Sequence, residues 1–156
     1  MKENSSKVLI TGATGWLGRE TVARVLDGKL DGISKSDLIL ASSNGRDLEL
    51  DSLGVFPTNA LAEFSDTKSK DAIDGLVHLA FITKDKTAEY SLSDYVAKNI
   101  ELISAACKII EREKPKWVVV VSSGAIIDRS TMEIENNVLR NPYGFCKRIE
   151  EELIAE

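Results

Sequence analysis

The chain has 156 residues, of which 43% are hydrophobic and 29% are charged, and its formal net charge is −5. This length predicts one domain with a substantial core, and the scattered Lys and Arg residues do not support binding to nucleic acid or to a membrane surface. No apolar run approaches the ~20 residues of a membrane span. The polar residues 1–7 lead directly into an apolar run, which is unlike a signal peptide. We therefore expect a soluble, cytoplasmic protein.

The first thirty residues predict a strand, a glycine turn and a helix. A strand is expected at 7–11, and the stretch Thr-Gly-Ala-Thr-Gly-Trp-Leu-Gly at 11–18 follows it. An amphipathic helix at 17–26 then stops at Gly28. A helix N-terminus attracts phosphate through unpaired N–H groups and its dipole, and glycines let the backbone approach a pyrophosphate. The pattern predicts a dinucleotide-binding loop, and the alternative is a purely structural glycine turn.

The middle of the chain predicts short elements: strands at 37–41 and 76–80, and a helix at 70–74 that Gly75 closes. Residues 43–70 carry the weakest pattern, with apolar pairs at 55–56 and 61–62 that suggest a short strand.

The longest predicted helix covers 91–114. Ser91 and Asp94 form a capping box at its start, and Pro115 ends it. Cys107 on this helix and Cys146 on the last one occupy apolar positions without metal-ligand spacing. Both are interpreted as small core residues in a reducing compartment.

The end of the chain predicts a strand at 117–122, apolar throughout and therefore buried on both faces, and a helix that Asn141 caps with Pro142 at its first position. Strands that alternate with helices imply right-handed crossovers and a parallel, doubly wound sheet. Ligands bind such sheets beyond the carboxyl ends of the strands.

A second group of residues suggests chemistry. Tyr143 and Lys147 stand four apart on the last helix and share one face. An ammonium near a phenol favours the phenolate, so such a pair can move a proton to or from a hydroxyl or carbonyl, although this spacing is also common in surface pairs. Ser122 and Ser123 lie at the end of the strand before it, where a serine could hydrogen-bond the same substrate oxygen. Ser122 alternatively satisfies backbone groups at the strand end.

These motifs, in this order, resemble the short-chain dehydrogenase/reductase family, and specifically its extended, NAD-dependent epimerase/dehydratase branch. The Thr-Gly-x-x-Gly-x-x-Gly form of 11–18 is typical of that branch, and 77–80 resembles the segment that passes the adenosine. The family often carries Tyr-Gly where this chain has 127–128, with the catalytic serine four residues earlier. This register selects Ser123 over Ser122.

The resemblance implies a Rossmann-like fold and a role for each matched residue. Tyr143 would be the general acid/base, and Lys147 would tune it and contact the nicotinamide ribose. Ser123 would orient the substrate oxygen, and Asn99 would support Lys147 through water. The cofactor-binding residues would be Gly12, Thr14, Gly15, Trp16, Leu17, Gly18, Ser42, Arg46, Ala80 and Lys147.

The choice of cofactor depends on the end of the strand at 37–41. A carboxylate there would bind a ribose 2′-OH and repel a 2′-phosphate, but the first acidic residue is Asp47. Hydroxyls such as Ser42, together with Arg46, suit a 2′-phosphate, so NADP is favoured over NAD.

Several of these residues also have purely structural interpretations. His78, the single histidine, is expected to be a packed strand residue, and Asn99 could be a polar group of the core. Trp16 is expected to pack beneath the glycine loop, as aromatic residues do in the family. The charged runs 111–114 and 150–152 are expected to be solvated helix faces.

The chain departs from the family at Glu156, shortly after the Tyr-x-x-x-Lys helix, where extended members continue with further strands and a substrate-binding region. We expect residues 1–156 to be a truncated NAD(P)-binding Rossmann domain. Phe145, Ile149 and Leu153 would be only partly covered, and the isolated chain would self-associate, for example as a homodimer.

The expected function is that of an NAD(P)-dependent oxidoreductase, epimerase or dehydratase acting on a small molecule, with a nucleotide sugar as the commonest class by family analogy. The alternative is a non-catalytic NAD(P)-binding module or an inactive fragment.

Overall fold

The computed structural model describes residues 7–128 and 130–155. It divides into two compact units. The first unit comprises the chain up to Ala80 together with Lys108–Val120, and the second comprises Phe81–Cys107 and the chain from Val121 onward. No helix in the described part of the chain is both long and apolar enough to cross a membrane.

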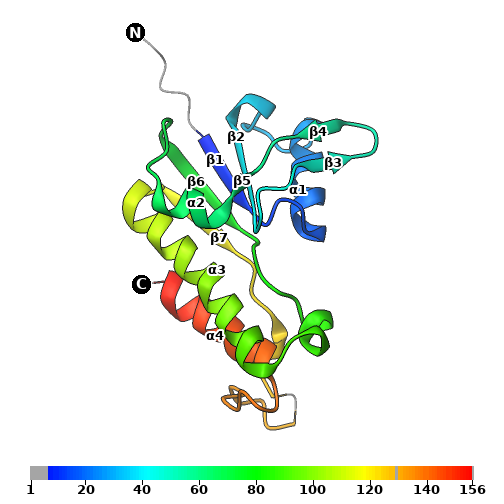
Figure 1. Cartoon of the computed structure of the whole chain (residues 1–156), viewed down its shortest axis with the longest axis vertical. Coiled ribbons are helices and arrows are strands. Elements are labelled where there is room, and N and C mark those ends of the chain that lie inside the picture. The colour runs from blue at the N-terminus through cyan, green and yellow to red at the C-terminus, as the bar shows by residue number, and fades with distance from the viewer. Residues whose placement is uncertain (1–6, 129, 156) are drawn as a thin grey trace. The chain divides into compact units, whose positions relative to one another are not determined.

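The first unit is built on a five-stranded sheet in which every pairing is parallel. Its strands are, in spatial order, β5 (Asn59–Ala60), β2 (Leu38–Ser42), β1 (Lys7–Thr11), β6 (Ile73–His78) and β7 (Trp117–Val120). The chain moves outward from β1 on one side of the sheet and then on the other, so α1 (Trp16–Leu26) and α2 (Leu61–Asp66) lie on opposite faces (Figure 1). This is a Rossmann-like, doubly wound fold, as the sequence predicts.

Apolar side chains of the central strands and α1 form the core of this sheet. Leu9 and Leu76 are fully buried on neighbouring strands, and Val22 faces inward from α1. The strand order reverses between β1 and β6, and ligands of such sheets bind at this switch point, beyond the carboxyl ends of the strands.

The middle of the chain differs from the prediction. The prediction of a helix at 70–74 is wrong, because β6 begins at Ile73 and pairs with β1 there. Gly75 lies inside this strand, where a Cβ would be 2.0 Å from the Trp117 ring, so its missing side chain makes room for the indole. The strand expected at 61–62 is also wrong, since α2 begins at Leu61.

The residues between β2 and β5 form a separate two-stranded antiparallel sheet, β3 (Leu48–Leu50) with β4 (Gly54–Phe56). The short strand expected at 55–56 is therefore present, but in this hairpin. Leu48, Leu50 and Phe56 are buried in the same core cluster as the strands of the main sheet.

The prediction that the strand at 117–122 is buried on both faces is wrong. β7 ends at Val120 and is an edge strand, with β6 as its single neighbour among the described residues. Trp117 and Val119 are 39% and 46% exposed. An apolar run alone cannot distinguish a central strand from an edge strand.

The second unit contains most of α3 (Leu92–Glu113), whose last residues belong to the first unit, and all of α4 (Pro142–Ile154). Half of the predicted capping box is shown: the Ser91 hydroxyl accepts a hydrogen bond from the Asp94 amide, and it is this hydroxyl that donates to the Asp94 carboxylate. The cap of α4 is also as predicted, because the Asn141 side chain accepts from the Gly144 amide.

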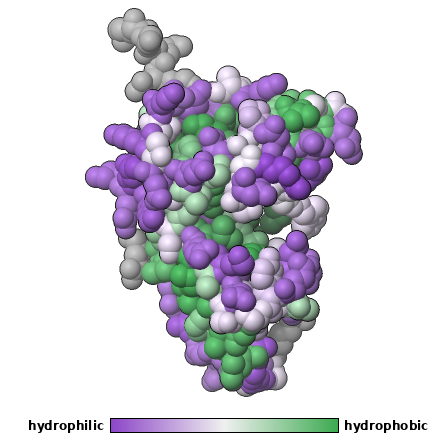
Figure 2. Space-filling view, in the orientation of Figure 1, coloured by the Kyte–Doolittle hydropathy of each residue, from purple (hydrophilic) through white to green (hydrophobic). Residues whose placement is uncertain are grey.

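Two short 3-10 helices, η2 (Lys84–Glu89) and η3 (Gly124–Ile126), complete the second unit; a third, η1 (Lys35–Asp37), precedes β2 in the first. Phe145 and Ile149 on α4 are partly exposed, and Leu153 is 49% exposed. Figure 2 shows that apolar side chains of this unit reach the surface.

Candidate active site

The glycine loop after β1 is packed too closely for side chains at two of its three glycines. Gly12 has φ of +67°, and a Cβ there would be 2.6 Å from the backbone of Leu79 and Ala80. A Cβ on Gly18 would be 2.2 Å from the Gly12 carbonyl oxygen. The loop therefore lies directly against the chain that leaves β6, and only glycine permits both approaches.

The loop ends in the N-terminus of α1. Gly15 is the N-cap residue, and no side chain of the described residues caps the helix. Unsatisfied N–H groups and the positive end of the helix dipole suit an anionic group. Thr14 and Leu17, the other two expected loop contacts, are partly exposed and exposed respectively.

The expectation that Trp16 packs beneath the loop is wrong, because this side chain is 81% exposed. Its place as the first residue of α1 directs it away from the core, which Val22 and Val25 face from the following turns.

A buried hydrogen bond joins the ends of the two central strands. The Thr11 hydroxyl lies 2.7 Å from Nδ1 of His78, and it also accepts from the Leu79 amide at 3.2 Å. Both Thr11 and His78 are fully buried. His78 is thus a packed strand residue, as expected, and it helps to fix the segment that borders the glycine loop.

The loop after β2 is held by hydroxyl groups. The buried Ser42 hydroxyl lies 2.8 Å from that of Thr58, which donates to the Arg46 carbonyl at 2.8 Å. The Ser42 hydroxyl therefore makes contacts inside the protein, whereas Arg46 is exposed. Of the two residues expected at the 2′ position, Arg46 is the accessible one.

In the second unit, Ser123 and Tyr143 lie on segments that are tied together. Ser123 caps η3 by accepting from the Ala125 amide at 3.2 Å. The Asn141 side chain donates to the Ala125 carbonyl at 2.6 Å, and a Cβ on Gly144 would be 2.3 Å from that same oxygen. The first turn of α4, which carries Tyr143, therefore packs directly on the turn that carries Ser123.

Asn99 occupies the interior of this unit. Its side-chain oxygen accepts from the Ile82 amide at 2.8 Å, and its nitrogen donates to the Tyr95 carbonyl at 3.2 Å. The Tyr95 hydroxyl donates to the Ile82 carbonyl at 2.6 Å, and burial raises the pKa of this phenol. Asn99 and Tyr95 together fix the start of the segment that follows β6.

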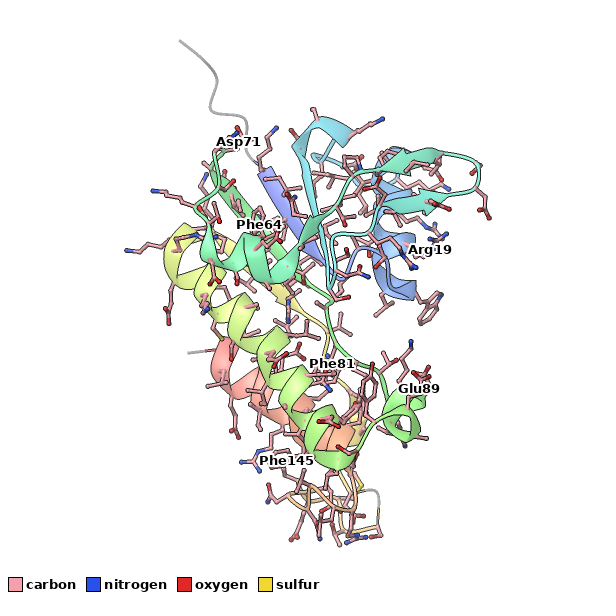
Figure 3. The ribbon with its side chains drawn as sticks, in the orientation of Figure 1. Arg19, Phe64, Asp71, Phe81, Glu89 and Phe145 are labelled. Carbon is pink, nitrogen blue, oxygen red and sulfur yellow. The ribbon has the colours of Figure 1, made fainter. Side chains whose placement is uncertain are left out.

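Lys147 is almost completely enclosed. Its Nζ donates to the Val121 carbonyl at 2.9 Å and to Glu150 Oε2 at 2.6 Å, and it lies 3.9 Å from the centroid of the Phe81 ring. The Phe81 ring meets the Tyr143 ring edge-on, with centroids 5.6 Å apart (Phe81 is labelled in Figure 3). Phe81 thus contacts both residues of the Tyr-x-x-x-Lys motif.

Sequence reasoning missed Glu150 and Phe81. The interpretation of 150–152 as a solvated face is wrong for Glu150, which is fully buried. Its spacing of three residues from Lys147 and seven from Tyr143 was the signal that could have placed it on the same face.

Within the charged run 111–114, Glu111 and Lys114 are exposed as expected, whereas Arg112 and Glu113 are not. The Glu113 side chain is only 4% exposed, and its carboxylate accepts from the Ser69 amide at 2.9 Å and from Arg112 at 2.7 Å. Arg112 also donates to the carbonyls of Phe64 and Ser65. These groups join the end of α3 to α2.

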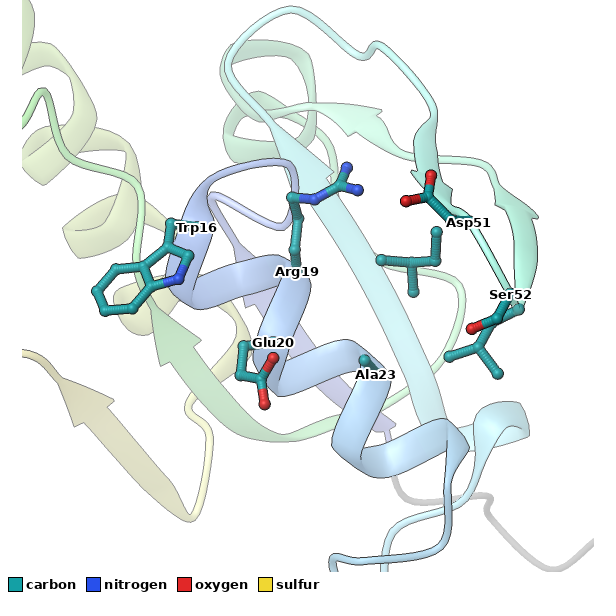
Figure 4. A pocket seen from close by; sticks show the side chains of 8 residues that line it. Trp16, Arg19, Glu20, Ala23, Asp51 and Ser52 are labelled. Carbon is teal, nitrogen blue, oxygen red and sulfur yellow. The ribbon is translucent and has the colours of Figure 1, made fainter.

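A shallow pocket of about 290 Å³ lies between the outer side of α1 and the β3–β4 hairpin. Figure 4 shows Arg19 from α1 and Asp51 from the hairpin reaching toward one another across it, with Trp16 at one end. It adjoins the first turn of α1, and its lining contains none of the residues that the sequence predicts for proton transfer.

Solved structures of several enzymes share this fold. An L-threonine dehydrogenase from Clostridium difficile matches 98% of this chain with a TM-score of 0.72 and 20% identity, and 49% of its own length is covered. UDP-glucose 4-epimerase from Bifidobacterium longum, solved with NAD+ and UDP, matches 96% of the chain with a TM-score of 0.69, 17% identity and 48% coverage of its own length.

A double mutant of dTDP-glucose 4,6-dehydratase from Streptomyces venezuelae, solved with NAD, matches 94% with a TM-score of 0.67, 17% identity and 50% coverage. The chain thus spans about half the length of these proteins. No curated protein sequence matches it. At the level of sequence families, residues 8–156 match the NAD dependent epimerase/dehydratase family, and because this is nearly the whole described chain, the protein belongs to that family.

Proposed function

We propose that this chain provides the cofactor-binding and proton-transfer residues of an NAD(P)-dependent dehydrogenase, epimerase or dehydratase. The observation that carries the proposal is the packing of α4 on η3, which brings Tyr143 and Ser123 onto adjoining turns, with Lys147 one helical turn further along. A protein that only bound a dinucleotide would have no need of all three groups.

The glycine loop fits the pyrophosphate of a dinucleotide. Gly12 and Gly18 make the backbone compact, and the N-terminus of α1 presents N–H groups without a side-chain cap. Gly15 has φ of −74°, and a Cβ there would meet only the Gly12 oxygen, at 3.2 Å. Gly15 therefore serves to leave space beside the loop rather than to permit its backbone conformation.

The bound nicotinamide would accept and return a hydride. Tyr143 would take a proton from the substrate hydroxyl during oxidation, or return it to the carbonyl during reduction. Because the Ser123 hydroxyl accepts from the Ala125 amide, its own proton can be donated to the same substrate oxygen. The Lys147 ammonium would stabilise negative charge that develops on the phenol oxygen.

We further propose that Arg46 favours NADP, because its exposed guanidinium can pair with a 2′-phosphate. The epimerase and the dehydratase were solved with NAD+ and NAD respectively, which makes NAD the competing cofactor. The proposed substrate class is nucleotide sugars, supported by the two sugar-nucleotide enzymes among these relatives. The threonine dehydrogenases make a small hydroxy amino acid the competing class.

Binding of NADH and NADPH to wild type and to Gly15→Val tests the cofactor site. The variant should remain folded and lose binding, since its methyl groups fill the space beside the loop. Unchanged affinity in a folded variant would contradict the proposal. Tyr143→Phe, in the protein that carries this chain, should slow the chemical step by at least ~100-fold and leave cofactor affinity nearly unchanged. Near-normal turnover would assign the proton transfer to another group.

A further inference from the structure

The inner face of α4 carries a buried ion pair. Tyr143, Cys146, Lys147 and Glu150 recur at intervals of three and four residues and therefore lie along one side of the helix. Lys147 is 5% exposed and Glu150 is fully buried. Burying two charges is costly unless each has a well-placed partner, so this pair requires an explanation.

The Lys147 ammonium has three kinds of neighbour: a backbone carbonyl, a carboxylate and an aromatic ring. It donates to a backbone oxygen of Val121, donates to the carboxylate of Glu150, and faces the ring of Phe81. Among the described residues, Glu150 supplies the only carboxylate within ion-pair distance of Lys147. A carbonyl and an aromatic ring can stabilise an ammonium, but only the carboxylate balances its charge.

The neighbouring pair on α4 shows what an ordinary surface contact looks like. Arg148 and Glu152 are joined at 2.7 Å, but their side chains are 32% and 58% exposed. Such pairs contribute little because water screens them. The side chains of Lys147 and Glu150 are 7% and 1% exposed, and the loss of one partner would leave a charge enclosed in the protein.

We propose that Glu150 is a positioning residue, whose carboxylate holds Lys147 as a charged ammonium against the Val121 carbonyl, one helical turn from Tyr143. A buried amine without a counter-ion tends to lose its proton or to move toward water. In either case the positive charge would leave the neighbourhood of Tyr143. The contact between Lys147 and Glu150 is sufficient evidence for the ion pair, while its consequence for catalysis rests on the proposed function.

The pair also depends on the charge of Glu150. Burial raises the pKa of this carboxyl, with a smaller contribution in the same direction from Glu151, while Lys147 opposes the rise. At pH values below this raised pKa the Glu150 carboxyl is neutral. It would therefore neutralise the charge of the Lys147 ammonium only at pH values above that pKa. Tyr143 and Cys146 are the other titratable groups on this side of α4, and Tyr95 lies on α3.

The test uses Glu150→Gln, which keeps the size and one hydrogen-bond acceptor but removes the charge. Glu152→Gln is the matched control, because it removes the same charge from an exposed position on the same helix. NMR of ¹⁵N-lysine-labelled protein detects ammonium protons that exchange slowly with water, and Lys147→Met assigns the signal. Exchange at Lys147 should be at least about tenfold faster in Glu150→Gln and unchanged in Glu152→Gln. Equal exchange rates of the Lys147 ammonium protons in wild type, Glu150→Gln and Glu152→Gln would overturn the proposal.

A double-mutant cycle keeps the proposal testable if a single variant folds poorly. Lys147→Met and Glu150→Leu should each lower stability, and the combined variant should recover most of the loss, because neither charge is then left buried alone. Additive losses would refute the pairing. If the protein neither binds cofactor nor catalyses hydride transfer, the proposed function fails, yet exchange and stability still decide whether Glu150 holds Lys147. Where turnover is measurable, Glu150→Gln should reduce it and Glu152→Gln should not.

Discussion

Gly18→Ala provides a direct test of how tightly the glycine loop is packed. The new Cβ would lie 2.2 Å from the Gly12 oxygen and 2.7 Å from Cα of Ala13, whereas ordinary contacts begin near 3.4 Å. The loop would have to move by roughly 1 Å to accept the methyl group. Both obstructing atoms belong to the backbone, so no side-chain rotation can relieve the clash.

The change in the free energy of unfolding caused by Gly18→Ala is the balance of two opposing contributions. Overpacking of this kind costs about 1–3 kcal/mol, and here it lies near the upper end because the obstacle is main chain. Replacing glycine by alanine inside a helix stabilises the folded state by roughly 0.5–1 kcal/mol. We therefore expect the free energy of unfolding to fall by about 2 kcal/mol. Gly15→Ala, where the nearest contact is 3.2 Å, should lose less than about 1 kcal/mol, mainly through its weaker N-cap.

Urea denaturation followed by tryptophan fluorescence measures this difference. The chain has two tryptophans, Trp16 at the start of α1 and Trp117 on β7, and both report on the first unit. If Gly18→Ala is as stable as wild type, or loses no more stability than Gly15→Ala, the packing argument for the loop is incorrect.

Three further predictions concern the cofactor, a thiol and the sheet edge. Arg46→Ala should weaken binding of NADPH much more than binding of NADH in parallel titrations, and equal losses would place this guanidinium away from the 2′ position. Burial raises the pKa of the Cys146 thiol to about 11, so alkylation by iodoacetamide at pH 8 should be at least about tenfold slower at Cys146 than in the urea-unfolded chain; similar rates in a peptide-mapping experiment would argue against its burial. The exposed Trp117 and Val119 on the edge strand β7 should promote self-association, which Val119→Lys should reduce. Size-exclusion chromatography over a range of concentrations checks this, and a monomer throughout would contradict it.

Local sequence patterns determined the elements that carry most of the expected site. Residues 8–18 combine an apolar strand with three glycines, so a strand, turn and helix were predictable from spacing alone. The caps at Ser91 and Asn141 were equally local, because each hydrogen bond joins residues only three positions apart. The order of the elements then implied a doubly wound parallel sheet.

The middle of the chain was not predictable in this way. The apolar pair at 55–56 forms a strand only because Leu48–Leu50 pairs with it. The six residues of α2, Leu61–Asp66, are too few to show a helical repeat of apolar residues in the sequence. Gly75 resembled a helix stop, yet it lies in β6, where it pairs with Val8 of β1, and the Trp117 ring occupies the space that a side chain would take. Each of these outcomes depends on a partner far away in the sequence.

Tertiary structure alone decided which polar groups are enclosed. Glu150 and Glu152 belong to the same run of three glutamates, and only their position around α4 separates a fully buried carboxylate from an exposed one. The sequence determined that Tyr143 and Lys147 share a face, since helical geometry depends on spacing. It did not determine that Phe81 and Val121 close over Lys147, because burial is a property of all the segments that pack around a side chain, and these come from separate parts of the chain.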